Sequence, residues 1–354
     1  MVDIVGHQVN RVAGPCPSPL DMMGQEVRMT VSVKDVAARA GVSAGTVSNA
    51  LNHPERVAPE TVERVRAAIA DLGYVRNDAA RQLRAGRSRS IGLIVLDMRN
   101  PFYADVARGA DARAEEVGLS VLLSDSARDS GRERRLIDLF AEQRASGVIA
   151  TPLTAELEHF ERLAERGVPV VLVDHEGDSD GLSTVSVDDR KGGRMAVERL
   201  LERGCRRIAF VGGPRDLRQV RDRYEGARRA VSDRAGAQLE RLGLEDLTVD
   251  HGRAAGEALL RREAADRPDG IFAANDLVAV GLLQALTMSG GVRVPEDMAI
   301  VGYDDIDFAA STVVPLTSVR QPAEQLGATA VELLAREPGE HVRFEPQLVP
   351  RETA

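Results

Sequence analysis

Four polar side chains occur close together on the first turns of a predicted helix: Ser43, Thr46, Ser48 and Asn49. Hydroxyl and amide groups of this kind hydrogen-bond to phosphate oxygens and to base edges in the major groove of DNA. The amide of Asn49 has the donor and acceptor pattern that suits adenine. This stretch is therefore a candidate for reading DNA sequence.

The surrounding residues predict the short helices that would position these side chains. Ser32 can cap a first helix with Asp35 as its capping-box partner, and residues 41–43 form the turn to the second helix. Apolar residues recur at helical spacing after Pro59, and Gly73 ends this third helix. Two helices joined by a three-residue turn are typical of a helix-turn-helix.

The stretch GVSAGTVSNALN at residues 41–52 resembles the LacI/GalR family of transcriptional regulators, whose pattern is roughly GVSxxTVSxxLN. The resemblance continues downstream over nearly all of residues 31–352. Lys34 and Arg56 are expected to contact phosphates and so to set the register on DNA, without reading sequence.

The family resemblance implies that bases are read by the two residues after Ser43 and by the residue after Ser48. In this chain those residues are Ala44, Gly45 and Asn49. Ala and Gly cannot make the bidentate hydrogen bonds that discriminate base pairs. We therefore expect base reading to shift to Asn49, Ser48 and Thr46.

Residues 76–89 resemble the family's hinge helix, in which Asn77, Ala80 and Leu83 match the pattern. The resemblance implies that Leu83 enters the minor groove as an apolar wedge while neighbouring arginines hold phosphates. A flexible basic linker is the alternative interpretation of this segment.

The distribution of charge separates one end of the chain from the rest. Residues 30–89 hold ten Lys and Arg against six Asp and Glu, a net charge of +4, whereas the whole chain carries −9. The other residues therefore sum to −13. A basic module on an acidic body directs the attraction for phosphate to one end of the protein.

From residue 91 onward, short apolar runs alternate with amphipathic helical patterns, and two such sets follow one another. This alternation predicts parallel, doubly wound sheets. We expect an α/β protein with an N-terminal three-helix helix-turn-helix domain, a hinge helix and a two-lobed, periplasmic-binding-protein-like effector domain.

A chain of 354 residues exceeds the usual size of one domain, so several parts are expected. The predicted parts are a disordered leader at 1–29, a helix-turn-helix domain at 30–75, a hinge at 76–89 and a core at 90–354. Within the core, the first lobe is expected at about 90–188 and 321–354, and the second at about 189–320.

Ligands of open α/β sheets bind beyond the carboxyl ends of the strands, so residues just after each predicted strand are candidates for an effector site. Asn100 and Asp174 follow predicted strands of the first lobe. The family resemblance implies polar contacts from Arg223, Asn275 and Asp304. It also implies flanking aromatic rings from Phe102 and Phe308.

Charged and amide groups beside aromatic rings suit a sugar, a sugar phosphate or a nucleobase-like molecule. Each candidate also has a structural alternative. Asn275 can be interpreted instead as the cap of the helix that starts at Asp276, and Asp304 and Asp305 as caps of the following turn.

Two other classes of protein share parts of these patterns, and both are disfavoured. A nicotinamide-dependent enzyme should show GxGxxG after its first strand, and this chain does not. A sugar-binding transport receptor would need a secretory signal and no basic module. Cys16 and Cys205 are the only cysteines, and no metal-ligand spacing occurs, so neither a metal nor another cofactor is expected.

The sequence thus predicts a cytoplasmic, non-enzymatic transcriptional regulator that acts as a repressor and as a homodimer. Its expected partners are double-stranded DNA with a palindromic operator and a small-molecule effector such as a sugar, with no membrane. The effector should bind between the two lobes and change the affinity for DNA.

Overall fold

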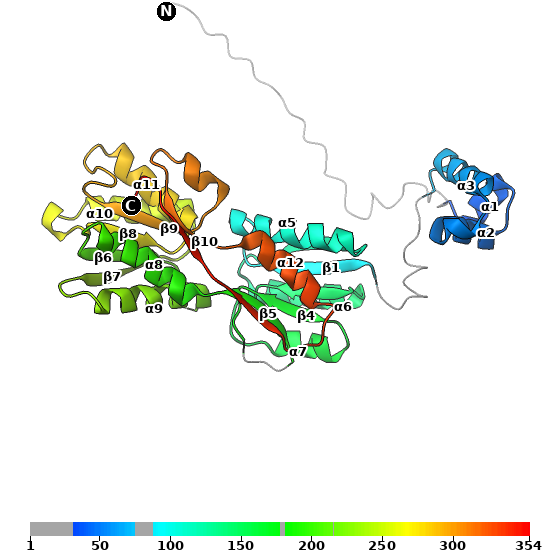
Figure 1. The fold of residues 1–354 in the computed structure, drawn as a ribbon, viewed down its shortest axis with the longest axis horizontal. Coiled ribbons are helices and arrows are strands. Elements are labelled where there is room, and N and C mark those ends of the chain that lie inside the picture. The colour runs from blue at the N-terminus through cyan, green and yellow to red at the C-terminus, as the bar shows by residue number, and fades with distance from the viewer. Residues whose placement is uncertain (1–30, 75–87, 178–180, 215) are drawn as a thin grey trace, which may run out of the picture. The chain divides into compact units, whose positions relative to one another are not determined.

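The computed structural model describes residues 31–74, 88–177, 181–214 and 216–354. The chain forms two compact units, which divide between residues 81 and 82. The smaller unit contains the following short helices (Figure 1): α1 (Val33–Ala40), α2 (Ala44–Asn52), the 3-10 turn η2 (Pro54–Arg56) and α3 (Pro59–Leu72).

Local sequence signals determine the ends of these helices. The backbone N–H and the hydroxyl of Ser32 donate hydrogen bonds of 2.8 and 2.7 Å to Asp35 Oδ2, which lower the pKa of that carboxyl group. Gly41 and Gly73 end α1 and α3 with left-handed backbone angles, φ 65° and 61°. The predicted capping box, turn and stop are confirmed.

The larger unit consists of two lobes, each built on a six-stranded sheet (Figure 1). The first sheet is parallel throughout and has the order β11-β5-β4-β3-β1-β2. Its strands are β1 (Ser90–Val95), β2 (Ser120–Asp125), β3 (Gly147–Ala150), β4 (Val170–Val173), β5 (Ser183–Val187) and β11 (His341–Phe344).

The second sheet has the order β12-β10-β9-β8-β6-β7 and is parallel except for the antiparallel pair of β10 and β12. Its strands are β6 (Arg207–Gly212), β7 (Gln238–Gly243), β8 (Gly270–Ala273), β9 (Ala299–Asp304), β10 (Thr317–Arg320) and β12 (Gln347–Val349).

Helices cover both faces of each sheet (Figure 1). In the first lobe they are α5 (Pro101–Glu116) and α12 (Ala323–Leu333) on one face, with α6 (Ser130–Glu142) and α7 (Glu158–Glu165) on the other. In the second lobe they are α8 (Asp189–Glu202), α9 (Arg218–Ser232), α10 (Val249–Leu260) and α11 (Asp276–Met288), with 3-10 turns η3 (Ala264–Asp266) and η4 (Asp307–Ser311).

Paired glycines let the covering helices approach one another closely. A Cβ atom on Gly109 of α5 would lie 1.9 Å from the carbonyl oxygen of Glu324, and one on Gly327 of α12 would lie 1.9 Å from that of Val106. Any larger side chain would therefore force the two backbones apart.

The two-lobed, doubly wound α/β prediction is confirmed.

The chain passes between the lobes three times, and the third passage corrects the predicted lobe boundaries. Residues 321–354 do not all return to the first lobe. β11 joins the first sheet, but after Pro346 the chain re-enters the second lobe as β12. There the hydroxyl of Thr353 donates a 2.7 Å hydrogen bond to the carbonyl of Ile300, and Ala354 is fully buried. Satisfying these buried groups holds the C-terminus in the second lobe.

Three strands within the core were not predicted. β5 has the sequence STVSV, in which polar residues alternate with valine although every position is buried. β7 lies at a sheet edge and contains Glu240 and Arg241, and β10 has only four residues. Short or polar strands lack the apolar run that marks a buried strand in a sequence. No helix among the described residues is long and apolar enough to cross a lipid bilayer.

Candidate functional site

Helix α2 presents the predicted DNA-reading side chains, and two of them also stabilise its first turn. The backbone N–H of Thr46 donates a 3.0 Å hydrogen bond to Ser43 Oγ, which makes Ser43 the N-cap. The Ser43 and Thr46 hydroxyls lie 2.9 Å apart, within hydrogen-bond distance. Ser43 therefore has a structural role beside any contact with DNA.

The exposed face of α2 carries the amide of Asn49. Val47 and Ala50 are buried against the other helices, whereas Gly45 and Asn49 are exposed and lie one turn apart. The Ser48 hydroxyl accepts a 3.3 Å hydrogen bond from Asn52 Nδ2. Among the described residues the Asn49 amide has no hydrogen-bond partner, so its donor and acceptor remain available for a base edge.

Gly45 leaves open space on this face. A Cβ atom added to it would meet only Ser43 Oγ, at 3.6 Å, which is an ordinary contact. Nothing within the described unit therefore requires glycine here. Ala44, by contrast, is half-buried against the small hydrophobic core.

The predicted phosphate contacts lie on the surface of the same unit. Lys34 is exposed, and so is Arg56, whose Nε lies 3.7 Å from a carboxylate oxygen of Glu55. Asn77, Ala80 and Leu83 lie outside the described residues.

Replacing Ser43 with Ala should destabilise α2 because the Thr46 N–H loses its acceptor. The expected cost is about 1 kcal/mol, or roughly fivefold faster amide hydrogen exchange at residues 44–52. Ser43→Asp is the matched control, since Asp is an equally good N-cap. It should restore slow exchange while weakening DNA binding, because its carboxylate would repel phosphates. Unchanged exchange in Ser43→Ala would contradict the capping role.

In the larger unit, six of the seven predicted effector residues line one cavity at the carboxyl ends of the two sheets. They are Asn100, Phe102, Asp174, Arg223, Asn275 and Asp304. Asn100 Nδ2 from the first lobe donates a 2.9 Å hydrogen bond to Asp304 Oδ2 from the second. Gln321, at the passage between the lobes, donates a 2.8 Å hydrogen bond to Asp304 Oδ1.

Arg223 holds the polar groups of the cavity together. Its Nε donates a 2.7 Å hydrogen bond to Asp189, its Nη1 donates a 2.8 Å hydrogen bond to the carbonyl of Ala274, and the same Nη1 lies 3.7 Å from Asp304 Oδ1. The guanidinium carbon lies 3.7 Å from the ring centroid of Tyr303. Burial alone would lower the pKa of Arg223, but the nearby carboxylates raise it, so the side chain stays charged.

Asp174 is a carboxyl group of the cavity whose environment disfavours its charged form. It follows β4 with a left-handed backbone angle, φ 57°, and accepts a 3.1 Å hydrogen bond from Gln219 Nε2. Burial and the neighbouring Asp189 raise its pKa to about 8. Burial also raises the pKa of Asp304, against the opposing influence of Arg223. The cavity can therefore change its charge near neutral pH.

Replacing Asp174 with Asn should flatten the pH dependence of core stability. The pKa of Asp174 is about 8 in the folded chain against an ordinary value of 3.8, so its contribution to stability is complete below about pH 4. That contribution is lost as the pH rises towards 8, because the unfolded chain then holds fewer protons at this group. Asn tolerates the left-handed backbone and can still accept the hydrogen bond from Gln219. Denaturant unfolding between pH 5 and 8 measures the difference.

Asp297→Asn is the control of opposite sign. Hydrogen bonds from Arg293 lower the pKa of Asp297 to about 2. Its contribution is therefore complete above the ordinary pKa and lost only in acid, so Asp297→Asn should leave the pH dependence of stability between pH 5 and 8 unchanged. An Asp174→Asn curve parallel to that of the unsubstituted chain would show that Asp174 does not titrate in this window.

Two predictions about the cavity are corrected or narrowed. Phe308 does not line the cavity: it lies on η4 and its side chain is 61% exposed, because this turn places the ring towards solvent. Asn275 lines the cavity and also caps α11, since its Oδ1 accepts a 3.0 Å hydrogen bond from Val278 N–H. Asp305 points elsewhere and pairs with Arg320 and Arg351.

Several residues that line the cavity were not singled out from the sequence. They are Leu96, Arg128, Leu217, Gln219, Leu247 and Gln321. Loop residues such as Arg128 and Leu247 carry no local signal, whereas Tyr103, which also lines the cavity, follows the first strand beside Phe102. The free volume of the cavity is about 30 Å³, room for roughly two water molecules. A larger ligand therefore requires the lobes or the lining side chains to move.

Within the part of the chain that the structure describes, no group of His, Cys, Asp or Glu is placed to hold a metal ion.

Comparisons with known proteins match both units. Residues 32–77 match the family of bacterial regulatory proteins of the lacI type, and residues 197–354 match the periplasmic binding protein-like domain. The chain is 34% identical over 328 residues to the ribose operon repressor of Halalkalibacterium halodurans, and the match covers 91% of this chain and 96% of the relative.

Two solved structures are similar over almost the whole chain. A complex of the transcriptional regulator CelR with cellobiose has a TM-score of 0.68 and 35% identity, and the match covers 92% of this chain and 100% of the other. A lac repressor dimer bound to operator and the anti-inducer ONPF has a TM-score of 0.79 and 27% identity. The match covers 91% of this chain and 98% of the repressor chain.

Proposed function

The chain belongs to the lacI family of bacterial regulatory proteins, and on this premise we propose that it is a repressor whose operator affinity changes when a sugar occupies the cavity between its lobes. The observation that carries the proposal is the joint lining of that cavity by both lobes, in the same chain as a helix-turn-helix. The Asn100–Asp304 hydrogen bond crosses between the lobes at this point. A ligand that displaces this bond would change how the lobes pack.

The chemistry of the cavity favours a polyhydroxylated ligand. The carboxyl groups of Asp174 and Asp304 can accept hydrogen bonds from hydroxyl groups, while the amides and the Arg223 guanidinium donate them. The rings of Phe102 and Tyr103 supply apolar surface beside these groups. The similarity to CelR, solved with cellobiose, and to a ribose operon repressor supports a sugar as the effector.

Helix α2 is the proposed base-reading element. Its exposed Asn49 amide supports adenine recognition, while Ser48 and Thr46, whose hydroxyls already have partners within the helix, are proposed to make secondary contacts. Lys34 and Arg56 are proposed to bind phosphates. Leu83, Asn77 and Ala80 retain the minor-groove and hinge roles that the family resemblance implies.

A homodimer is proposed to form along the free edge of the first sheet. β2 is the edge strand, yet Leu122 and Leu123 on it are 42% and 39% exposed, and Leu139 on α6 is 41% exposed. An uncovered apolar edge strand promotes unwanted pairing between chains, so a specific partner is expected to cover it. A second copy of this chain meets a palindromic operator with matching two-fold symmetry.

The proposed regulation couples the cavity to DNA through this dimer edge. β1 and β2 both end at the cavity side of the first lobe, so a movement of the lobes changes the surface that meets the partner. A coupling free energy of about 1 to 3 kcal/mol would change operator affinity roughly 5-fold to 150-fold. We propose that, as an operator-binding protein, it acts in the cytoplasm and has no catalytic step.

Selection of DNA from a random-sequence pool by the purified full-length protein tests this function. The expected result is a palindrome in which one adenine of each half-site loses its enrichment when Asn49 is replaced by Ala. Titration of the selected DNA complex with D-ribose and cellobiose should then shift its affinity. Absence of any enriched palindrome, with and without these sugars, would contradict the proposal.

A further inference from the structure

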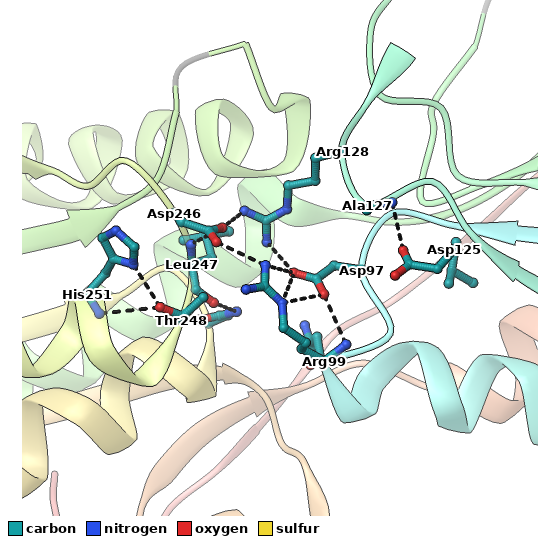
Figure 2. A network of polar contacts seen from close by, with 12 residues as sticks. Asp97, Arg99, Asp125, Ala127, Arg128, Asp246, Leu247, Thr248 and His251 are labelled. Carbon is teal, nitrogen blue, oxygen red and sulfur yellow. Dashed lines mark hydrogen bonds and ion pairs between the residues drawn. The ribbon is translucent and has the colours of Figure 1, made fainter. Parts of the chain in front are cut away.

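An ion-pair cluster joins the two lobes through Asp246, as Figure 2 shows. Asp246 follows β7 in the second lobe and contacts two arginines of the first. Its Oδ2 lies 3.0 Å from Arg99 Nη2, and its Oδ1 accepts a short hydrogen bond from Arg128 Nη1. Asp97 of the first lobe pairs with both arginines. Its Oδ2 lies 2.7 Å from Arg99 Nη2 and 3.2 Å from Arg128 Nη2.

The first-lobe half of this cluster is held in place independently of Asp246. Ala127 and Arg128 both have left-handed backbone angles, φ 50° and 56°, which are uncommon for residues other than glycine. The Arg128 N–H donates a 3.1 Å hydrogen bond to the carbonyl of Leu96, and the Ala127 N–H donates a 2.8 Å hydrogen bond to Asp125 Oδ1. Contacts within the first lobe therefore fix the backbone of this turn without any contribution from Asp246.

The cluster lies away from the chain passages that connect the lobes. Those passages run from β5 into α8, from β10 into α12 and from β11 into β12. The strands β11 and β5 lie at one edge of the first sheet order, and β12 and β10 at one edge of the second. Asp97 and Arg128 follow β1 and β2, and Asp246 follows β7, which lie at the opposite edge of each order. The lobes can separate at this opposite edge, so an interaction there controls their opening. Beside the passages, the connecting chain itself holds the lobes together.

The cluster also borders the cavity. Arg128 and Leu247, the residue next to Asp246, both line it. The Leu247 N–H donates a 2.7 Å hydrogen bond to Asp246 Oδ1, and the Leu247 carbonyl accepts a 3.4 Å hydrogen bond from Asn275 Nδ2. Separating Asp246 from the arginines would therefore withdraw part of the cavity wall.

We propose that Asp246 is a positioning residue that latches the second lobe onto Arg99 and Arg128 and thereby keeps the cavity closed between rounds of effector exchange. The proposal rests on the proposed function only in naming the cavity as the effector's. The side chains of Asp246 and Arg128 are 23% and 20% exposed, so dissolved salt can reach the latch. Screening should weaken it, because the Debye length falls from about 10 Å at 0.1 M salt to about 3 Å at 1 M.

A distance measurement between the lobes tests the latch without any effector. Spin labels are placed on cysteines introduced at the exposed helical positions Ala112 and Ala254 of the full chain, with Cys16 replaced by Ser. Cys205 is buried, and burial raises the pKa of its thiol to about 11, so it should stay unlabelled at neutral pH. An excess of unlabelled chain leaves at most one labelled protomer in each dimer.

Asp246→Asn should raise the ratio of open to closed lobes about 5-fold to 30-fold, seen as a population at longer distance. Asn keeps an oxygen for the Leu247 N–H, so the loop itself remains intact. Raising salt should open the unsubstituted chain but have little effect on Asp246→Asn. Asp297→Asn, which removes a carboxylate paired within the second lobe, should behave like the unsubstituted chain at both salt concentrations.

The latch is overturned if Asp246→Asn has the distance distribution of the unsubstituted chain. It is also overturned if salt leaves the unsubstituted chain closed, or shifts both chains equally. Because no sugar is present, failure of D-ribose and cellobiose to act on the DNA complex would count against the proposed function and leave this result unaffected.

Discussion

Replacing Leu122 with Asp is expected to lower affinity for a palindromic operator by about 10² to 10⁴-fold. The β2 register pairs Leu122 with Gly92, a residue that faces Phe140 of α6, so Leu122 lies on the same side of the sheet as that helix. An Asp at this exposed apolar position would have to lose its water in a dimer interface. Without the dimer, two half-sites can no longer be bound together, and the gain from bivalent binding disappears.

Sedimentation and fluorescence anisotropy separate the two parts of this expectation. Leu122→Asp should sediment as a monomer and should bind an isolated half-site as the unsubstituted chain does. Ala258→Asp, which adds the same charge to an exposed position of α10, is the matched control and should remain a dimer. A dimeric Leu122→Asp protein would show that the edge of β2 is not the interface.

Replacing Arg223 with Lys is expected to abolish the response to effector while leaving operator binding without effector within about twofold. Lysine keeps the buried positive charge between Asp189 and Asp304, but its single ammonium group cannot reproduce the planar set of N–H donors of the guanidinium. Loss of two charge-assisted hydrogen bonds at about 1.5 kcal/mol each corresponds to roughly 100-fold weaker effector binding. The measurement is a titration of the operator complex with whichever sugar, D-ribose or cellobiose, shifts the unsubstituted chain.

Lysine is a better choice than alanine because Arg223 is also a structural residue. Removing its charge would leave Asp189 and Asp304 without their cation in a buried site, at a cost of about 3 to 5 kcal/mol. A lost response could then reflect a damaged core. Arg293→Lys changes an exposed ion pair of the same lobe and controls for the substitution itself. A full response from Arg223→Lys would move the effector site away from this cavity.

The sequence by itself determined the helix-turn-helix almost to the residue. Capping by Ser32 and Asp35, the turn at Gly41 and the stop at Gly73 depend on residues within a few positions of one another. Such local interactions appear directly in a sequence. The position of the cavity followed from a rule of similar generality, because carboxyl ends of parallel strands meet at one edge of a sheet. That rule, with the family resemblance, placed six of the seven candidate residues on one cavity.

Only the tertiary structure decided which side chains meet across long separations. Phe308 follows a strand of the second lobe, yet its turn directs it into solvent. The C-terminal residues divide between the lobes because the Thr353 hydroxyl donates a hydrogen bond to the buried carbonyl of Ile300 in the second lobe. The contact of Arg128 with Asp246 joins loops 118 residues apart in the sequence, through a left-handed backbone that non-glycine residues seldom adopt. These features depend on packing between segments that have no local relation, so no spacing or periodicity in the chain could have indicated them.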